Sequence, residues 1–367
     1  MKKLLDDTST RIKAFYQEKK RYQPLVAFLA GFIWDSLTLT RIDLLIDNLV
    51  MFAYIVFAGV FIFLINMVEE KQLENKNLLK YSNWYPNIVQ FFFGGLFSGY
   101  VVYYFKSASL SKSWLFLLFL LFLFIGNEFI KNRLNNLVFQ FVFYYLATYS
   151  FFIFYLPVLF KTMGIFMFLL SGLVSSAFVG FLIYILYKNM PEKINERFKR
   201  LVLILGSIYL IFNLLYFTNI IPPVPLSLKD SGIFHSVRFN NGRYSARYEE
   251  GKWYEFFKDS DDTFRYAAGD TVFCFAAVFA PTDLNTGIRH HWQMYNENQD
   301  KWQTTDRLNY KISGGRDGGY RGYTFKKNVQ PGLWRVDVET EREQLLGRIS
   351  FEVIADSTHY PFEETDF

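Results

Sequence analysis

The chain has 367 residues, of which 51% are hydrophobic and 20% aromatic, and its formal net charge is +5. Residues 1–221 carry 21 basic and 12 acidic residues, whereas residues 222–367 carry 18 basic and 22 acidic ones. This distribution indicates a polytopic membrane domain followed by a soluble domain. The net negative charge of the second part argues against nucleic-acid binding, because neutralising phosphates requires a basic surface.

Residues 1–23 are predicted to be a basic cytoplasmic tail. They are too polar to be a signal peptide, since no apolar h-region precedes the first span. Their Lys and Arg residues set the membrane orientation or, alternatively, recognise anionic headgroups.

Residues 24–221 are predicted to form a polytopic transmembrane domain, because they contain apolar runs that reach or approach the ~20 residues a spanning helix needs. The clear runs are 49–66, 86–105, 137–156, 164–187 and 201–221, with a shorter one at 113–126. A seventh segment, 24–39, contains Asp35 and either spans the membrane or lies on its surface.

Loop charge favours seven spans. If 24–39 crosses, seventeen Lys and Arg residues of the tail and of loops 67–85, 127–136 and 188–200 share one side, against four on the other. If it does not cross, the two sides hold eleven and ten. The positive-inside rule therefore predicts a cytoplasmic N-terminus and a C-terminal domain outside the cytoplasm, in a cell (inner) membrane.

Five polar residues gather where the first span ends and the second begins: Asp35, Arg41, Asp43, Asp47 and Asn48. On a helix, Asp43 and Asp47 would share one face, as a charge relay or ion path facing the bundle requires. Alternatively, this is an outer loop in which Asp47 and Asn48 cap the next helix. The rarity of ionisable groups deep in lipid favours the loop.

The spans contain no histidine, which excludes histidine relays and histidine ligation of a metal or haem within them. Small residues recur at helical spacing and predict close approach of helix backbones. They are Gly95 and Gly99 in one span, and Gly172, Ser176 and Gly180 in another.

Residues 222–228 form a proline-rich linker, because proline lacks the amide that a continuing helix needs. From there the hydrophobic period changes to two. In "LWRVDVET", Trp334, Val336 and Val338 alternate with polar residues, as in a half-buried antiparallel strand. About seven such strands predict that residues 229–367 form an all-β sandwich of immunoglobulin-like size, with Trp334 as a core anchor.

A distinctive set of residues runs through these strands. The set comprises His290, Trp292, Gly314-Gly315-Arg316, Tyr320-Arg321, Pro331-Gly332, Trp334-Arg335-Val336, Gly347 and Phe351. In these residues the C-terminal module resembles the family called domain of unknown function 2914 (DUF2914). The resemblance implies a modular architecture in which the hairpin is a recurring structural signature and Trp292, Pro331, Gly332 and Trp334 are structural anchors. It implies no catalytic residue.

The glycine-rich hairpin "GGRDGGYRG" is the candidate interaction site. It has neither the order of a phosphate-binding loop nor the carboxylates of a calcium loop. On the following strand, Arg321, Tyr323 and Phe325 are expected to pack inward, with Arg321 near the rim, which leaves Arg316, Asp317 and Tyr320 exposed at or beside the tip. The candidate interaction residues are therefore Arg316, Asp317, Tyr320 and Arg321. Alternatively, Arg316 and Asp317 only pair across the turn.

Other candidate chemistry in this domain is sparse. His290 and His291 are adjacent and must point to opposite faces of a strand, so they cannot form a paired metal site. His290 is expected to be a satisfied histidine at the core edge, Cys274 a small buried hydrophobe, and the acidic turn around Asp261 a solvated loop. The sequence predicts no cofactor, no metal and no catalytic residues.

Three classes of function remain open. The leading one is a non-enzymatic membrane protein whose β-sandwich binds an envelope protein or glycan. The second is a sensor or transporter that uses Arg41, Asp43 and Asp47 for coupling. The third is a membrane-embedded enzyme acting on lipid-linked substrates.

Overall fold

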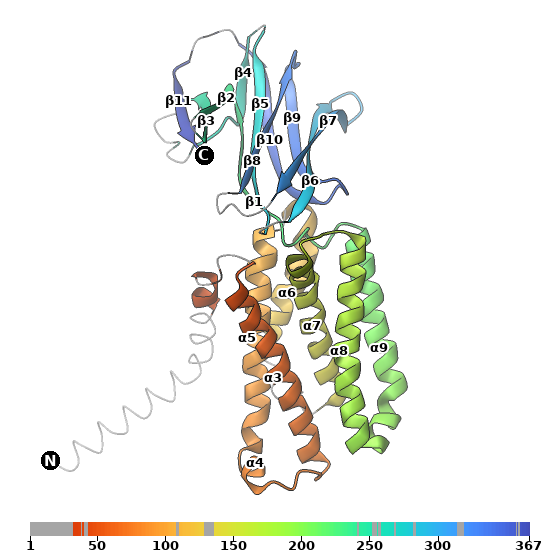
Figure 1. Cartoon of the computed structure of the whole chain (residues 1–367). Helices are drawn as coiled ribbons and strands as arrows, with labels where there is room; N and C mark the ends of the chain where they lie inside the picture. Colours follow the sequence, from red (N-terminus) through yellow and green to blue (C-terminus); the bar gives the residue numbers. More distant parts are fainter. Residues whose placement is uncertain are drawn as a thin grey trace, which may run out of the picture.

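The computed structural model describes residues 32–37, 39, 43–107, 110–127, 136–240, 242–251, 255, 258–267, 269–281, 284–313, 319–356, 358 and 360–367. In these residues a helical bundle is followed by an all-β domain (Figure 1). The bundle helices are α3 (Leu45–Glu69), α4 (Lys76–Lys80), α5 (Tyr85–Ser107), α6 (Leu110–Asn127), α7 (Leu137–Phe160), α8 (Ile165–Asn189) and α9 (Pro191–Phe217).

Five helical segments of the described chain are long and apolar enough to cross a membrane: Leu45–Glu69, Ser82–Ser107, Leu137–Phe160, Ile165–Asn189 and Pro191–Phe217. They contain most or all of the five clear runs of the sequence, and the run 113–126 lies in the shorter α6. Residues 32–37 are helical, whereas most of 24–39 lies outside the described residues. Seven spans therefore stay a prediction.

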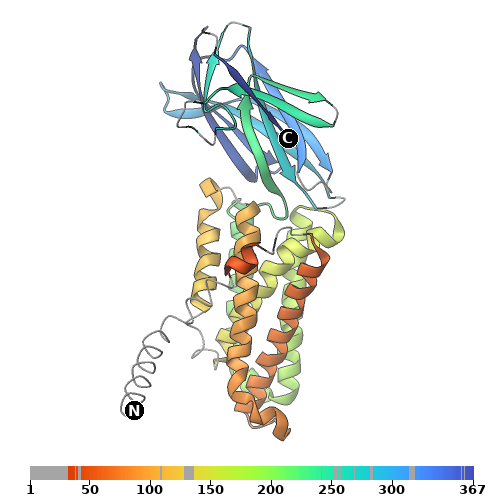
Figure 2. The same ribbon diagram turned by 90° about the vertical axis from the view of Figure 1, so that its left-hand side faces the viewer.

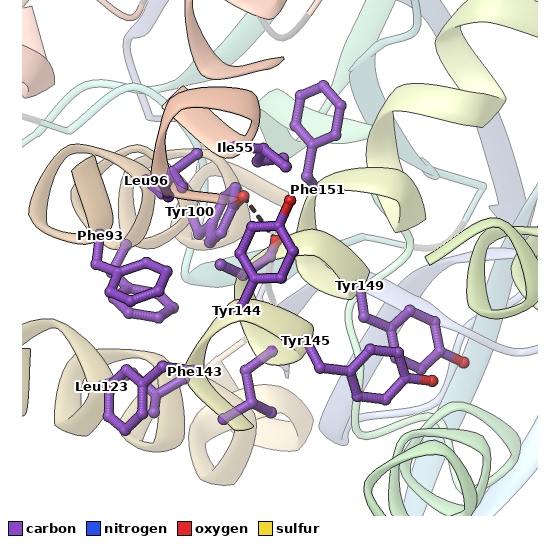
Figure 3. Packing of buried hydrophobic residues seen from close by; sticks show 14 of the residues in the cluster. Ile55, Phe93, Leu96, Tyr100, Leu123, Phe143, Tyr144, Tyr145, Tyr149 and Phe151 are labelled. Atoms are coloured by element: carbon purple, nitrogen blue, oxygen red, sulfur yellow. Dashed lines mark hydrogen bonds between the residues drawn. The ribbon is translucent and has the colours of Figure 1, made fainter. Parts of the chain in front are cut away.

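Aromatic side chains fill the centre of the bundle (Figure 3). The buried Tyr100 of α5 donates a hydrogen bond to the Ala147 carbonyl of α7 at 2.7 Å. One helix turn away, Tyr104 reaches the Ser150 carbonyl at 3.0 Å. Buried tyrosines need such partners, and these bonds fix α5 against α7.

Gly95, Gly99 and Gly172 lie at packed contacts, but the atoms nearest to them belong to side chains and not, as predicted, to helix backbones. A Cβ added at Gly172 would lie 2.7 Å from the hydroxyl of Tyr149 and would also collide with Tyr209. Gly180 differs, because a Cβ there would meet nothing within 4 Å.

Eleven strands form the β domain in the described residues, more than the seven expected. They are β1 (Ser227–Phe234), β2 (Ser236–Asn240), β3 (Arg243–Glu249), β4 (Thr263–Tyr266), β5 (Thr271–Phe279), β6 (Asn285–Asn296), β7 (Lys301–Ser313), β8 (Tyr320–Lys327), β9 (Gly332–Thr340), β10 (Leu345–Ala355) and β11 (Phe362–Asp366). Three sheets result, with strand orders β1-β5-β8, β4-β10-β9-β6-β7 and β11-β3-β2.

Strand β5 shows how the sheets are layered. Val272 and the buried Cys274 pack with Trp292 and Trp334 of the five-stranded sheet. On the opposite side of β5, Phe275 packs with residues of β2 and β3. The domain is therefore a sandwich of two sheets whose three-stranded side is partly covered by the small third sheet.

The β domain stands on one end of the bundle, and α4 lies at the other end (Figures 1 and 2). Phe279 of β5 packs into the aromatic core of the bundle. In the turn between β9 and β10, Arg342 donates a hydrogen bond to the Tyr216 hydroxyl and lies over its ring, 4.9 Å from the centroid. The last helix and the β domain are thus joined by side-chain contacts as well as by the linker.

Candidate functional site

The five-stranded sheet has a polar face on the side away from its core. Strand alternation places Arg335, Asp337 and Glu339 of β9 on that side, since Trp334, Val336 and Val338 lie in the core. The register then brings polar residues of β6, β7 and β10 beside them. We call this surface the outer sheet face; it comprises Arg289, His291, Gln293, Tyr295, Trp302, Thr304, Arg335, Asp337, Glu339 and Arg348.

Asp337 is the centre of the network on this face. Its carboxylate accepts hydrogen bonds from Arg348 Nε at 2.6 Å and from Nη2 at 2.8 Å. Gln293 Nε2 donates a third hydrogen bond at 3.1 Å. A carboxylate that is 4% exposed requires this compensation, because an unpaired buried charge is costly.

Arg335 connects that network to an aromatic side chain. Its Nε and Nη2 atoms donate to Gln293 Oε1 at 3.1 and 2.7 Å, and its guanidinium lies 4.3 Å from the centroid of Trp302. Within the described residues, its Nη1 atom makes no hydrogen bond. Burial lowers the pKa of Arg335, but a guanidinium remains charged at neutral pH. Arg335 is thus a half-buried cation held in one position, and its Nη1 atom is available to donate hydrogen bonds to a ligand.

Three potential metal ligands meet here: His291, Asp337 and Glu339 place one ligand atom each within 4.8 Å of one another. The surroundings do not suit a cation. Arg348 already holds Asp337 in two hydrogen bonds, and Arg289 Nη1 lies 3.6 Å from Glu339 Oε1. The two guanidinium groups neutralise the carboxylates, so we assign the cluster to an ion-pair network.

The same face contains a series that resembles a nucleophile, base and acid. Thr304 Oγ1 lies 2.8 Å from His291 Nε2, and His291 Nδ1 lies 3.5 Å from Glu339 Oε1. Acyl transfer also needs donors aimed at the developing oxyanion. Thr304 lies on β7, the edge strand of this sheet, and His291 lies on the neighbouring β6. We assign these contacts to the polar network of the outer sheet face.

Comparison with family models finds a match within the β domain. Residues 285–353 match the family model described as protein of unknown function (DUF2914). The C-terminal region thus contains a DUF2914 module, as the sequence resemblance implied. The DUF2914 segment runs from β6 into β10 and contains every residue of the outer sheet face.

Solved structures with some similarity include an immunoglobulin-like protein from Pseudomonas aeruginosa. It is 12% identical, with 36% of this chain and 98% of that chain covered, at a TM-score of 0.22. Another is the alkylpurine DNA glycosylase AlkC of Pseudomonas fluorescens bound to DNA containing an abasic site analog. It is 9% identical, with 77% and 83% covered, at a TM-score of 0.22. No curated protein matches the chain by sequence.

The glycine-rich hairpin of the DUF2914 segment is described only at its flanks. Arg316 and Asp317 lie outside the described residues. Tyr320 was expected to be exposed, but it packs against the buried cluster that contains Val278. The flank at Tyr320 therefore lies at the end of the sandwich that rests on the bundle, where Phe279 follows Val278.

The inward face of β8 was also predicted wrongly. Tyr323 and Phe325 are 39% and 52% exposed. The opposite face packs inward, where the hydroxyl of Thr324 contacts Trp292 Nε1 at 3.0 Å and His290 Nδ1 at 2.9 Å. The buried rings of Trp292 and His290 need a small polar partner at this position. The alternation of apolar and polar residues in the sequence does not predict such a partner.

His290 is satisfied, as predicted, but it is fully buried and does not lie at the core edge. Its Nε2 atom lies 3.1 Å from the Tyr310 hydroxyl, which completes the pair of contacts begun by Thr324. His291, on the opposite side of the strand, belongs to the outer sheet face. The expected separation of the two histidines is therefore present.

Sequence reasoning missed a second buried polar cluster. Asp261 was expected in a solvated turn, but it is 1% exposed, and burial raises its pKa to about 6. His235 Nε2 lies 3.7 Å from Asp261 Oδ2 and 3.3 Å from Glu249 Oε1. Lys258 lies 3.4 Å from Asp261 Oδ1, and Arg265 pairs with Glu249. These contacts join β3 to the segment before β4, and only the fold brings them together.

The polar residues before and at the start of α3 do not share one helix face, but Asp35, Asp43 and Asp47 all lie close enough to Tyr103 of α5 to interact with it electrostatically. Arg41 lies outside the described residues, and Asp43 lies in a turn before α3, not on a helix face with Asp47. Asp47 and Asn48 do not cap α3 either. The N-cap is Leu44, without a side-chain hydrogen bond, and Asn48 Nδ2 donates to the Leu44 carbonyl at 3.1 Å. Both residues sit in the first turn, where the helix dipole favours an acidic side chain such as Asp47.

Asp35 lies close to Ser98 of α5, and Asp47 lies 3.4 Å from the hydroxyl of Tyr103 on the same helix. A separate apolar cavity of about 710 Å³ opens between α8 and α9. No acidic or basic side chain lines it. Among the described residues, this cavity therefore contains no acid–base pair.

Proposed function

We propose that the protein is a multi-pass membrane protein that presents its DUF2914 module outside the cytoplasm as a non-enzymatic binding domain, in a sandwich of immunoglobulin-like size. Five helices with the length and apolarity of spans support membrane insertion. The basic loops support the orientation, because the α3–α5 and α8–α9 connections lie at the end of the bundle opposite the β domain (Figure 1).

Contacts of the first segment support a seventh crossing. Phe32 packs against Phe124 of α6, with 5.2 Å between ring centroids. Seven residues further on, the Leu39 carbonyl accepts a hydrogen bond from Lys106 near the end of α5. The segment thus follows the bundle toward the β domain, as a spanning helix with a cytoplasmic start would.

The binding role rests on one observation: Arg335 is held in place by Gln293 and Trp302 while its Nη1 atom stays unused within the described residues. An arginine fork beside an indole ring suits a ligand with a carboxylate and a flat apolar side, and both side chains favour binding hot spots. Acidic envelope glycans and acidic protein surfaces offer this chemistry.

The test measures binding of the purified full-length protein to arrays of acidic and neutral glycans and to acidic protein surfaces. We expect retention on acidic ligands, weakened about tenfold by Arg335→Ala or Trp302→Ala. Arg307→Ala is the matched control, because Arg307 is a more exposed arginine on the same sheet. Equal loss with all three variants would indicate nonspecific charge attraction and contradict the proposal.

A further inference from the structure

A strip of aromatic rings lies on the other side of the β domain. It begins at Phe239 of β2, 57% exposed, and continues through Tyr244 of β3 with 4.8 Å between ring centroids. Tyr244 lies 6.2 Å from Tyr323 of β8, and Phe273 of β5 lies 5.9 Å from Tyr323 and 5.7 Å from Phe325. We call these five residues the aromatic strip. The small third sheet covers the neighbouring Phe275 but leaves Tyr323 and Phe325 open.

The strand beneath the strip has an open edge. Strand β8 is the last strand of the sheet β1-β5-β8. In the described part of the chain, its backbone hydrogen bonds go to β5 alone. Alternate amides and carbonyls of an edge strand point away from the sheet and can pair with another extended chain.

The charged side chains of β8 determine which kind of extended chain can pair with it. Arg321 and Lys327 share a face with Tyr323 and Phe325, because residues two apart point the same way. Neither cation makes an ion pair within the described residues. A second copy of β8, paired antiparallel about Thr324, would set Arg321 against Lys327, and like charges directly opposite are destabilising. In this register the edge therefore repels a second copy of itself.

We propose that β8 binds an extended acidic peptide by strand addition. Residues opposite Arg321 and Lys327 would be Asp or Glu, and residues opposite Tyr323 and Phe325 would be apolar. The partner then reads acidic-x-apolar-x-apolar-x-acidic. Backbone pairing provides affinity, and the alternate side chains provide specificity. This surface lies across the sandwich from the outer sheet face and does not depend on it.

The probe is a fluorescent heptapeptide, ETFTVTE, added to the full-length protein in lipid nanodiscs and followed by fluorescence anisotropy. We expect saturable binding that is lost with a scrambled peptide and with a peptide N-methylated at alternate amides. The double variant Arg321→Glu, Lys327→Glu should bind ETFTVTE about tenfold more weakly and gain affinity for KTFTVTK. Phe325→Ser should weaken both peptides.

Controls separate this site from the rest of the domain. Arg307→Ala, which changes an exposed arginine of the five-stranded sheet, should leave peptide binding unchanged. Unchanged melting temperatures would show that the β8 variants are folded. Equal binding of the scrambled peptide, or no binding of ETFTVTE, would overturn the proposal. Self-association of the wild-type protein that Phe325→Ser abolishes would assign the strip to a second copy and would also overturn it.

Discussion

Two tryptophans of the five-stranded sheet, Trp334 and Trp302, allow core and surface roles to be separated. Trp334 is 2% exposed and donates to the Gln330 carbonyl at 2.8 Å. We expect Trp334→Ala to lower the free energy of unfolding of the β domain by about 3–5 kcal/mol, the range for a buried aromatic. Trp302→Ala, on the outer sheet face, should cost far less, as denaturant unfolding of the two variants can show. Similar losses would place Trp302 in the fold rather than at a binding surface.

His290 should make the β domain sensitive to acid. Burial lowers its pKa to about 3, from 6.5. Below pH 6.5 the unfolded chain binds a proton at His290 that the folded chain does not bind. The contribution of neutral His290 to the free energy of unfolding is therefore fully present above pH 6.5 and decreases as the pH falls below it. At about 1.4 kcal/mol per pH unit, the loss from pH 7 to pH 5 is about 2 kcal/mol.

The measurement compares unfolding at pH 7 and pH 5 for the wild type and for His290→Gln, which cannot titrate. The difference between the two proteins cancels the contribution of Asp261. Its pKa is raised to about 6, so protonation of Asp261 acts in the opposite direction over this interval. Identical pH dependence of both proteins would show that His290 is not buried as a neutral group.

At the scale of elements, the position of helix α8 depends on one glycine. Gly172→Val should force α8 away from Tyr149 and Tyr209, since overpacking typically costs about 1–3 kcal/mol. Gly180→Val on the same helix is the matched control, because its Cβ would enter open space. Thermal unfolding in detergent should show a lower melting temperature for the first variant only. A decrease of equal size in both would mean that helix propensity, not packing, is responsible.

The strands from β5 to β10 could be predicted from the sequence, because each is a run of strand length bounded by turn residues, and β9 and β10 also alternate regularly. The same alternation correctly places Arg335, Asp337 and Glu339 on one side. It does not reveal that Gln293 and His291 lie beside them, since register is a tertiary property. The inward face of β8 was missed because Gly322 there accommodates the ring of Tyr310: an added Cβ would lie 2.8 Å from it. Asp261 was missed because its partners come from three separate segments.

For the whole molecule, the prediction that can be tested directly is topology. An odd number of crossings from a cytoplasmic N-terminus places residue 367 outside the cytoplasm. Fusion of alkaline phosphatase at that point should be active, and fusion of a fluorescent protein that folds only in the cytoplasm should be dark. Fluorescence without phosphatase activity would mean that 24–39 does not cross and that the β domain faces the cytoplasm.

Because the β domain stands on one end of the bundle, its position determines which partners can pair with the edge of strand β8. Strand β8 starts beside the bundle at Tyr320, so a rise of about 3.3 Å per residue puts Phe325 about 17 Å farther out. A flexible tether of about ten residues covers that distance. A peptide anchored in the same bilayer would then act at an effective concentration near the millimolar range. A contact too weak to capture a freely diffusing protein would be enough to hold a neighbour in the membrane.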